Sequence, residues 1–347
     1  MTTDTLSLKT RWADFRRQNP KSRIRDAAKQ LGVSETELLV TGVGQTVVRL
    51  AGDFRELLKQ VSSLGYVMAL TRNDVLVHER KGVYEKVSFN NHVGLVLGPD
   101  IDLRLFMHRW QWGFAVNEND RRSLQFFDAQ GEAIHKIYLT DQSNLAAYEN
   151  LVAAFRSDDQ SDRLLIAPSD EKVADKPDAA IDVPGFQSSW LAMQDTHEFF
   201  GLLRQYSVGR QQGLRLAPEG HAQLLSMDIL KQVFANAADR DVSIMVFVSN
   251  PGCIQIHTGS VKKLVQMGPW YNVLDPAFNL HLNETLVDQV WLTKKPTADG
   301  IVTALELFDK TGQNVALVFG ERKPGKPELD TWRVAVADAL AASLTGV

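Results

Sequence analysis

The stretch "VMALTRNDVLVHERKG" at residues 67–82 decides the fold, because a related stretch, "IMVFVSNPGCIQIHTG", returns at residues 244–259. The two stretches begin 177 residues apart, and two further pairs of segments keep the same order at offsets of 177 and 181 residues. These further pairs are "GPDIDLRLF" (98–106) with "DPAFNLHLN" (275–283), and "LQFFDAQGEAIHKIYL" (124–139) with "LELFDKTGQNVALVFG" (305–320). Matched segments at a nearly constant spacing predict a tandem duplication.

The boundary between the repeats is predicted from a change in composition. Residues 157–186, "SDDQSDRLLIAPSDEKVADKPDAAIDVPGF", contain many aspartates, three prolines and little periodicity. Such a segment is typical of a linker or an exposed crossover. We therefore predict an N-terminal repeat at 1–156, a linker at 157–186 and a C-terminal repeat at 187–347.

Each repeat has helical patterning first and strand patterning afterwards. Ser34 and Glu37 have the spacing of a capping box at a helix start, and Ser188 is a plausible cap for the helix of the second repeat. Alternating segments such as "VLVHERKG" and "VTALELFD" follow, and Asp-Ala-Gln-Gly and Asp-Lys-Thr-Gly turns suit hairpins between them. The sequence predicts an α+β fold in which each half is a large antiparallel β-sheet with flanking helices.

Bulk composition limits the classes of function. The 347 residues are 44% hydrophobic and 23% charged, as in an ordinary globular protein, and the net charge of -4 offers no basic field for nucleic acid. No run approaches the roughly 18 apolar residues of a membrane span, and the first residues lack signal-peptide character, so we expect a cytoplasmic protein that is not membrane-inserted. The single cysteine, Cys253, follows a Pro-Gly turn and is expected to be structural.

One histidine stands out, in "DTHEFFGLLRQY" at residues 195–206. The eight histidines of the chain form no i, i+4 pair on a helix, which leaves little support for a zinc or facial-triad iron site. His197 is expected in the middle of an apolar helix, one turn before Gly201, where a flat ligand would find room. On local sequence alone, a histidine on a helix is more often a core or surface residue than a ligand. The apolar positions at helical spacing are Phe199, Phe200, Leu202, Leu203 and Tyr206.

Several arginines and lysines are candidates for binding an anion. Strand alternation puts Arg104 on one face with Asp102 and Phe106, where it needs either an anion or a polar network such as a pair with a neighbouring carboxylate. In the second repeat, three basic residues in predicted loops would bind carboxylates if they converge, and are otherwise solvated. These residues are Arg210, Lys295 and Arg322.

Taken together, these segments resemble the cytoplasmic haem-trafficking and haem-degrading proteins of Gram-negative haem uptake systems, the HemS, ChuS and PhuS type. The resemblance covers essentially the whole chain. It is carried by "VMALTRN", "VHERKGVY", "DIDLRLF", "DTHEFF", "IQIHTG", "WYNVLDPAFNLHL", "KPTADGIVTALELFD" and "FGERKPG", in the same order as in that family.

The resemblance implies a site for haem b (iron protoporphyrin IX) in a cleft between the halves. His197 would be the proximal axial ligand and Arg104 would approach from the distal side as the catalytic candidate. Basic residues near the haem propionates would be Arg210, Lys295 and Arg322, with Lys294 as the alternative to Lys295. Phe106 and Phe247 would cover the macrocycle. His78 aligns with His257, which favours a repeated structural role over a second haem site.

Two functions fit such a site, since the family includes both carriers and enzymes. A carrier would deliver haem to a separate haem oxygenase, whereas an enzyme would open the macrocycle oxidatively, with Arg104 as a hydrogen-bond donor and an external reductant supplying electrons. Haem is the implied partner, together with a haem oxygenase and the cytoplasmic side of a haem ABC transporter. A structural or regulatory module without a ligand is the third reading.

Overall fold

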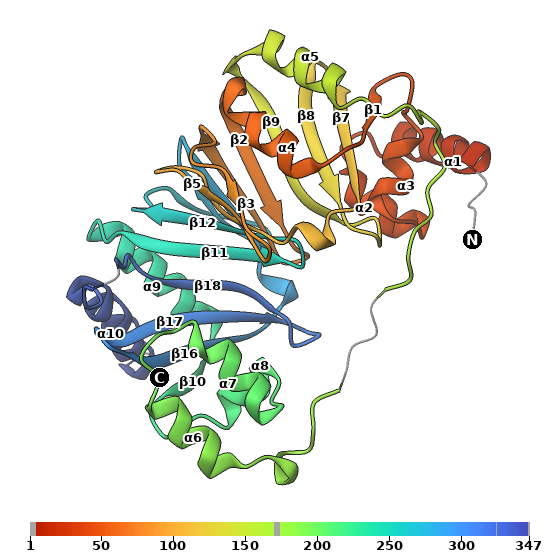
Figure 1. The fold of residues 1–347 in the computed structure, drawn as a ribbon. Coiled ribbons are helices and arrows are strands. Elements are labelled where there is room, and N and C mark those ends of the chain that lie inside the picture. Colours follow the sequence, from red (N-terminus) through yellow and green to blue (C-terminus); the bar gives the residue numbers. More distant parts are fainter. Residues whose placement is uncertain (1–4, 170–173, 324, 346–347) are drawn as a thin grey trace. The chain divides into compact units, whose positions relative to one another are not determined.

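The computed structural model describes residues 5–169, 174–323 and 325–345, and the chain divides into two units (Figure 1). Unit 1 comprises residues 1–72, 79–171 and 250–255, and unit 2 comprises residues 73–78, 172–249 and 256–347. Each unit has also exchanged a short segment with the other, which the sequence does not reveal.

Unit 1 is built on the antiparallel strand order β1-β7-β8-β9-β2, with β4, β5 and β6 in a second sheet. The helices contributed by the first repeat are α1 (Thr5–Gln18), α2 (Ile24–Leu31), α3 (Glu35–Val40), α4 (Phe54–Gln60) and α5 (Leu145–Ala154). The strands are β1 (Val47–Leu50), β2 (Gly65–Arg72), β3 (Leu76–Gly82), β4 (Ser88–Phe89), β5 (Gly94–Leu97), β6 (Asp102–Leu105), β7 (Trp112–Glu118), β8 (Arg121–Phe127) and β9 (Ala133–Ser143).

Strand alternation gives the main sheet of unit 1 two apolar faces. On β7, Ala115 belongs to the cluster that includes Leu57 of α4 and Leu151 of α5, whereas Phe114 packs with Leu39 of α3. Successive side chains on a strand point to opposite faces, so an apolar run such as that of β7 is buried on both sides. The predicted capping box begins α3: the Glu37 backbone N donates to Ser34 Oγ (3.3 Å), and the Ser34 backbone N donates to Glu37 Oε2 (2.8 Å).

Unit 2 has the corresponding strand order β10-β16-β17-β18-β11, with β13, β14 and β15 in a second sheet. Its helices are α6 (Val183–Leu191), α7 (Glu198–Tyr206), α8 (Arg210–Arg215), α9 (Met227–Asp239) and α10 (Asp330–Thr345). The strands of the second repeat are β10 (Ala222–Leu225), β11 (Ile244–Asn250), β12 (Cys253–Gly259), β13 (Leu264–Met267), β14 (Trp270–Leu274), β15 (Phe278–Asn283), β16 (Val287–Thr297), β17 (Gly300–Asp309) and β18 (Asn314–Gly320).

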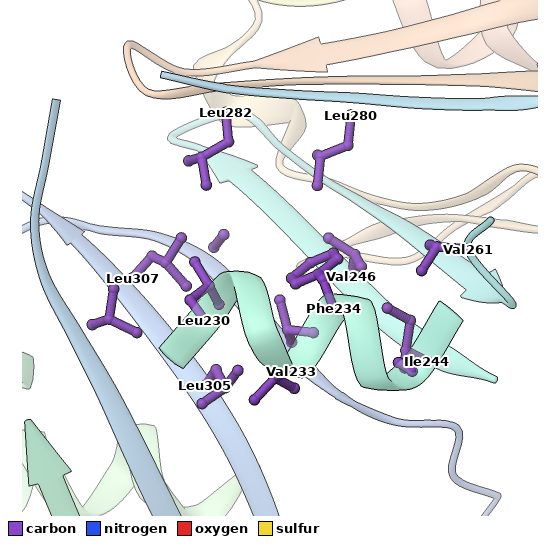
Figure 2. Close-up of a cluster of buried hydrophobic side chains, with 14 of the residues drawn as sticks. Leu230, Val233, Phe234, Ile244, Val246, Val261, Leu280, Leu282, Leu305 and Leu307 are labelled. Atoms are coloured by element: carbon purple, nitrogen blue, oxygen red, sulfur yellow. The ribbon is translucent and has the colours of Figure 1, made fainter. Parts of the chain in front are cut away.

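One face of the main sheet of unit 2 packs on α9, and the other on α6 to α8. Figure 2 shows Leu230, Val233 and Phe234 of α9 beside strand residues such as Leu305 and Val246. A separate buried cluster on the opposite face joins helices α6, α7 and α8 to β17 through Phe308. The helices that position the candidate site are therefore anchored to the sheet by a core of their own.

Two hairpin turns show the duplication at atomic detail. Asp128 Oδ1 accepts hydrogen bonds from the backbone N of Gln130 (3.0 Å) and of Glu132 (2.8 Å) between β8 and β9. Asp309 Oδ1 accepts from Thr311 (2.8 Å) and Gln313 (3.0 Å) between β17 and β18. Each turn contains a glycine at positive φ, +80° in the first repeat and +75° in the second. The predicted tandem α+β duplication is confirmed.

Asn73 and Asn250 hold the two exchanged segments in place. Asn73 Nδ2 donates to the backbone O of Ser249 (2.9 Å) and Val315 (2.8 Å) in unit 2. Asn250 Nδ2 donates to the backbone O of Arg72 (2.9 Å) and Ile134 (2.8 Å) in unit 1. The two asparagines are 177 residues apart and occupy equivalent positions in the "TRND" and "VSNP" turns.

The exchange takes place within single strands. The first residues of β3, through His78, belong to unit 2, and the first residues of β12, through Gln255, belong to unit 1. By hydrogen bonding, each sheet has nine strands, in the orders β1-β7-β8-β9-β2-β3-β15-β14-β13 and β10-β16-β17-β18-β11-β12-β6-β5-β4. Both sheets therefore contain strands from both repeats.

Candidate functional site

His197 lies at the start of α7, not in the middle of a helix. The predicted single helix is interrupted: α6 begins after Asp182 and ends at Leu191, so Ser188 lies within it and is not its cap. Asp195 Oδ1 accepts a hydrogen bond from the His197 backbone N (2.8 Å), and α7 begins at Glu198. A side-chain acceptor two residues before a backbone N–H competes with helical hydrogen bonding, which explains the break without Gly or Pro.

The imidazole of His197 is almost fully exposed and is held on one side. Its side chain is 94% exposed, and Nδ1 lies 2.6 Å from Asp195 Oδ1. The hydrogen bond from the His197 backbone N holds the pKa of Asp195 below its usual range, helped by the imidazole itself and by the charge of Arg322. Within the described ranges, Nε2 has no hydrogen-bond partner, so it is the ring atom available to a ligand.

The helix α7 presents two different faces. Phe199, Leu202 and Leu203 are buried in the core of unit 2. On the other face Phe200 is 63% exposed, and the Arg204 guanidinium carbon lies 5.2 Å from the centre of its ring. Side chains three, four and seven positions apart share one side of a helix, so both residues lie on the side of His197. Phe200 is one of the apolar positions at helical spacing in the sequence, and its exposure beside His197 makes it a candidate contact for an apolar ligand.

Gly201 also lies on this exposed side of α7. A Cβ atom built there would meet nothing within 4 Å. The room next to His197 is therefore open space at the surface of the helix, and the missing side chain is not what creates it.

Arg210 and Lys295 meet at one buried carboxylate. Glu306 is fully buried, and its Oε2 accepts from Arg210 Nε at 2.8 Å while Oε1 accepts from Lys295 Nζ. Burial alone would raise the pKa of Glu306, but the charges of Arg210 and Lys295 reverse that effect and bring it to about 2. Burial lowers the pKa of Lys295, and the charge of Glu306 offsets part of this shift. Two cations on one anion leave this cluster with a net positive charge.

The two adjacent lysines on β16 occupy different environments. Lys295 Nζ lies 4.4 Å from the centre of the Phe199 ring, and only 7% of the Lys295 side chain is exposed. Lys294 is exposed. Lys295 is therefore a buried ion-pair residue, and Arg210, at 26% side-chain exposure, is the better placed of the two Glu306 partners to contact a ligand.

An aromatic surface lies on the same sheet face as Glu306. Phe247 of β11 and Phe319 of β18 are half-buried, with ring centres 5.0 Å apart. Leu317 pairs with Phe247 on one side and with Glu306 on the other, so these side chains lie on one face of the sheet. Sequence reasoning selected Phe247 and missed Phe319, although alternation along "VALVFG" places Phe319 on the same face as Leu317.

Arg322 follows β18 and is half-buried. Its Nε is buried and has no hydrogen-bond partner in the described part of the chain. Its charge acts on Asp195, the residue that holds His197.

Five of the predicted site residues belong to unit 2: His197, Arg210, Phe247, Lys295 and Arg322.

The two predicted residues of the first repeat belong to unit 1. Arg104 is one-third exposed and forms an ion pair with Asp102, and its Nη1 also donates to the Leu103 backbone O (3.1 Å). Leu103 is fully buried on the opposite side of the strand, as alternation predicts. The sequence analysis left open whether Arg104 pairs with a neighbouring carboxylate, and in the structure it does. Phe106 is half-buried just beyond β6.

Two aligned histidines, His78 and His257, lie in the interior of unit 2. The rings of both pack against Phe278, with centre distances of 5.0 Å and 3.7 Å. The 3.7 Å pair is nearly parallel, at 3°. This common environment supports the repeated structural role predicted for the pair.

A buried polar cluster in unit 1 contains a histidine that sequence reasoning did not select. His135 Nε2 lies 2.5 Å from the Tyr84 hydroxyl, and Nδ1 lies 2.8 Å from Thr71 Oγ1. Burial lowers the pKa of His135 to about 3 and raises that of the nearby Cys253 thiol to about 12. Cys253 is therefore an inert interior residue, as its turn context predicts.

These features define a class of protein: a duplicated α+β chain whose exposed imidazole, held at one nitrogen, lies in the same unit as aromatic and cationic side chains. The chain belongs to the family described as the haemin-degrading HemS.ChuX domain, whose model matches residues 32–155 and 207–339. The two matched segments follow the two repeats. Asp195 and His197 lie between them.

Curated relatives and solved structures match nearly the full chain. The hemin transport proteins HmuS of Yersinia pestis and HemS of Yersinia enterocolitica are 40% and 39% identical, each over 95% of this chain and 96% of the relative. Holo-PhuS, a heme-binding protein from Pseudomonas aeruginosa, is 44% identical with a TM-score of 0.93, over 96% of this chain and 98% of its own. The heme degrading enzyme ChuS of Escherichia coli O157:H7 is 37% identical with a TM-score of 0.89, over 96% and 99%.

Two kinds of feature are absent from the described residues. No helix there is long and apolar enough to cross a membrane. No group of three or more His, Cys, Asp or Glu side chains within those ranges could hold a metal ion.

Proposed function

We propose that this chain binds haem, iron protoporphyrin IX, through His197 Nε2. The observation that carries the proposal is the state of this imidazole: 94% exposed, hydrogen-bonded at Nδ1 and open at Nε2. A metal-binding histidine characteristically gives its other ring nitrogen to a carboxylate or carbonyl oxygen. The relatives named for hemin transport and heme binding support the same ligand.

The surrounding residues fit a flat apolar anion. Phe200, Phe247 and Phe319 offer aromatic contacts, and apolar walls with a few placed polar groups are typical of cofactor sites. Arg210 belongs to a cluster with net positive charge, and Arg322 has an unpartnered Nε within the described ranges. We assign these two guanidinium groups to the propionates, with Lys295 contributing through Glu306. We also propose Arg104 as the distal residue and Phe106 as a residue that covers the macrocycle.

The same residues serve a carrier or an enzyme, so the two activities are proposed as alternatives. Bound haem supplies iron coordination and redox chemistry, and the protein binds, orients and releases it. One solved relative is described as a heme degrading enzyme and the curated relatives as hemin transport proteins, so relatives support both. We propose a cytoplasmic location, with a haem oxygenase and a haem ABC transporter as partners for the carrier.

Titration with hemin tests the proposal. We expect the unaltered protein to give a saturable one-to-one Soret spectrum and His197→Ala to give a spectrum that is lost or strongly shifted. Identical spectra for the two proteins would remove His197 as the ligand. Ascorbate added to the complex in air then separates the alternatives: conversion of the Soret band to a ring-opened product indicates an enzyme, and an unchanged band with haem transfer to a haem oxygenase indicates a carrier.

A further inference from the structure

Asp195 holds His197 at two points with one oxygen atom. Its Oδ1 accepts from the His197 backbone N at 2.8 Å and lies 2.6 Å from His197 Nδ1. The first contact fixes the start of α7, and the second fixes the ring relative to that start. The imidazole is otherwise 94% exposed, so this carboxylate is its main restraint on orientation.

The chemistry of the pair selects the ring nitrogen that is free. An ionised carboxylate only accepts hydrogen bonds, so Nδ1 must carry the proton in the contact with Asp195. A neutral imidazole has a single N–H, which leaves the lone pair on Nε2. The tautomer and the direction of the lone pair are thus both set by Asp195.

We propose that Asp195 is a positioning residue for the iron ligand, setting the tautomer of His197 and strengthening its bond to haem iron. This inference rests on the proposed function. A carboxylate on the far nitrogen makes the imidazole more basic, which strengthens the bond from Nε2 to the metal.

Asp195→Asn separates this role from that of starting the helix. The amide oxygen still accepts from the His197 backbone N, whereas the negative charge on the imidazole side is lost. Glu198→Gln is the matched control, because Glu198 is an exposed carboxylate adjacent to His197 whose Oε2 accepts from the Gln194 backbone N at 3.1 Å. The Glu198→Gln substitution changes the charge near His197 but leaves the contacts of its imidazole unchanged.

Two measurements are made on the full chain loaded with hemin. Resonance Raman of the reduced complex gives the iron–histidine stretching frequency, and transfer to excess apomyoglobin gives the rate of haem loss. We expect Asp195→Asn to lower the frequency and to release haem at least about 10-fold faster, the size found when partners of metal ligands are removed. Glu198→Gln should match the unaltered protein in both.

The outcomes separate this inference from the proposed function. If the unaltered protein binds hemin through His197 but Asp195→Asn keeps its frequency and release rate, the positioning role is wrong and haem binding stands. If the unaltered protein shows no saturable binding, or His197→Ala leaves the spectrum unchanged, both fail. Circular dichroism checks that Asp195→Asn is folded. Asp195→Ala should lower the iron–histidine frequency further and release haem faster than Asp195→Asn does.

Discussion

Glu306 shows at the scale of a single residue how the site acquires its charge. A fully buried carboxylate is stable only when paired, and here two cations from β16 and α8 pair with it. Because one carboxylate cannot neutralise two cations, Arg210 still attracts an anion. In the proposed function, the buried ion cluster would contribute to binding through Arg210, while Lys295 would balance the charge of Glu306.

Removing Glu306 should destabilise the protein strongly. We expect Glu306→Ala to lower the free energy of unfolding by about 3–5 kcal/mol, since it leaves a buried ammonium group uncompensated. The double variant Lys295→Met/Glu306→Gln removes both charges, so its free energy of unfolding should fall by less than that of Glu306→Ala. Urea unfolding measures the free energy of unfolding of both variants.

Lys294→Met is the control for this comparison, because Lys294 is the exposed neighbour of Lys295. Its free energy of unfolding should stay within about 0.5 kcal/mol of the unaltered protein. A Glu306→Ala variant as stable as this control would mean that the ion cluster does not exist.

At the scale of the element, α7 combines an anchored face with an exposed one. Buried Phe199, Leu202 and Leu203 fix the helix to unit 2, so the exposed side can carry residues that packing does not require. Phe200 is such a residue, because an aromatic side chain 63% exposed contributes little to the core. Because it lies on the side of His197, we propose that it contacts the ligand.

Phe200→Ser should therefore separate binding from stability. We expect its melting temperature to be unchanged, because little apolar area is buried in the free protein. Hemin affinity should fall about 10-fold, since burying a phenylalanine against a ligand is worth roughly 1.5 kcal/mol or more. Leu191→Ser is the control, because Leu191 ends α6 and is 51% exposed. Equal hemin affinities for both variants would exclude Phe200 from the site.

Elements also show what the sequence could predict. The capping box at Ser34, the aspartate turns and the face of Arg104 follow from short local patterns, and all are present in the structure. The break before His197 depends on one side chain accepting a backbone hydrogen bond, which periodicity does not reveal. The burial of Lys295 depends on Glu306 across a hairpin, so only the strand register discloses it.

At the scale of the whole molecule, stability should depend on pH through interior groups. The folded protein keeps His135 neutral down to a pKa of about 3, whereas the unfolded chain takes up this proton near pH 6.5. The unfolded state therefore binds more protons in this window, and stability falls as pH falls from about 6.5 to 3. The limiting slope for one such group is about 1.4 kcal/mol per pH unit.

His135→Gln removes this contribution. Between pH 6.5 and 4.5 its denaturant midpoint should vary less with pH than that of the unaltered protein. Below that range, protonation of Glu35 and Glu306 lowers stability in both proteins, since burial alone would raise the pKa values of these carboxyls but their cationic partners bring them to about 2. His92→Gln, at an exposed position, is the control and should keep the full pH dependence. Parallel curves for all three proteins would show that His135 is not buried as described.

The exchanged segments have a consequence for how such a chain can evolve. Unit 1 needs residues 250–255, where the Gly252 backbone O accepts from Trp110 Nε1 (2.9 Å), and unit 2 needs residues 73–78. The two segments are equivalent in the two repeats, so each copy of the duplicated gene encodes its own version of the segment that its unit takes from the other copy. Neither unit is therefore encoded by one uninterrupted stretch of sequence, and a substitution in an exchanged segment alters a strand of the unit that the other copy mainly encodes.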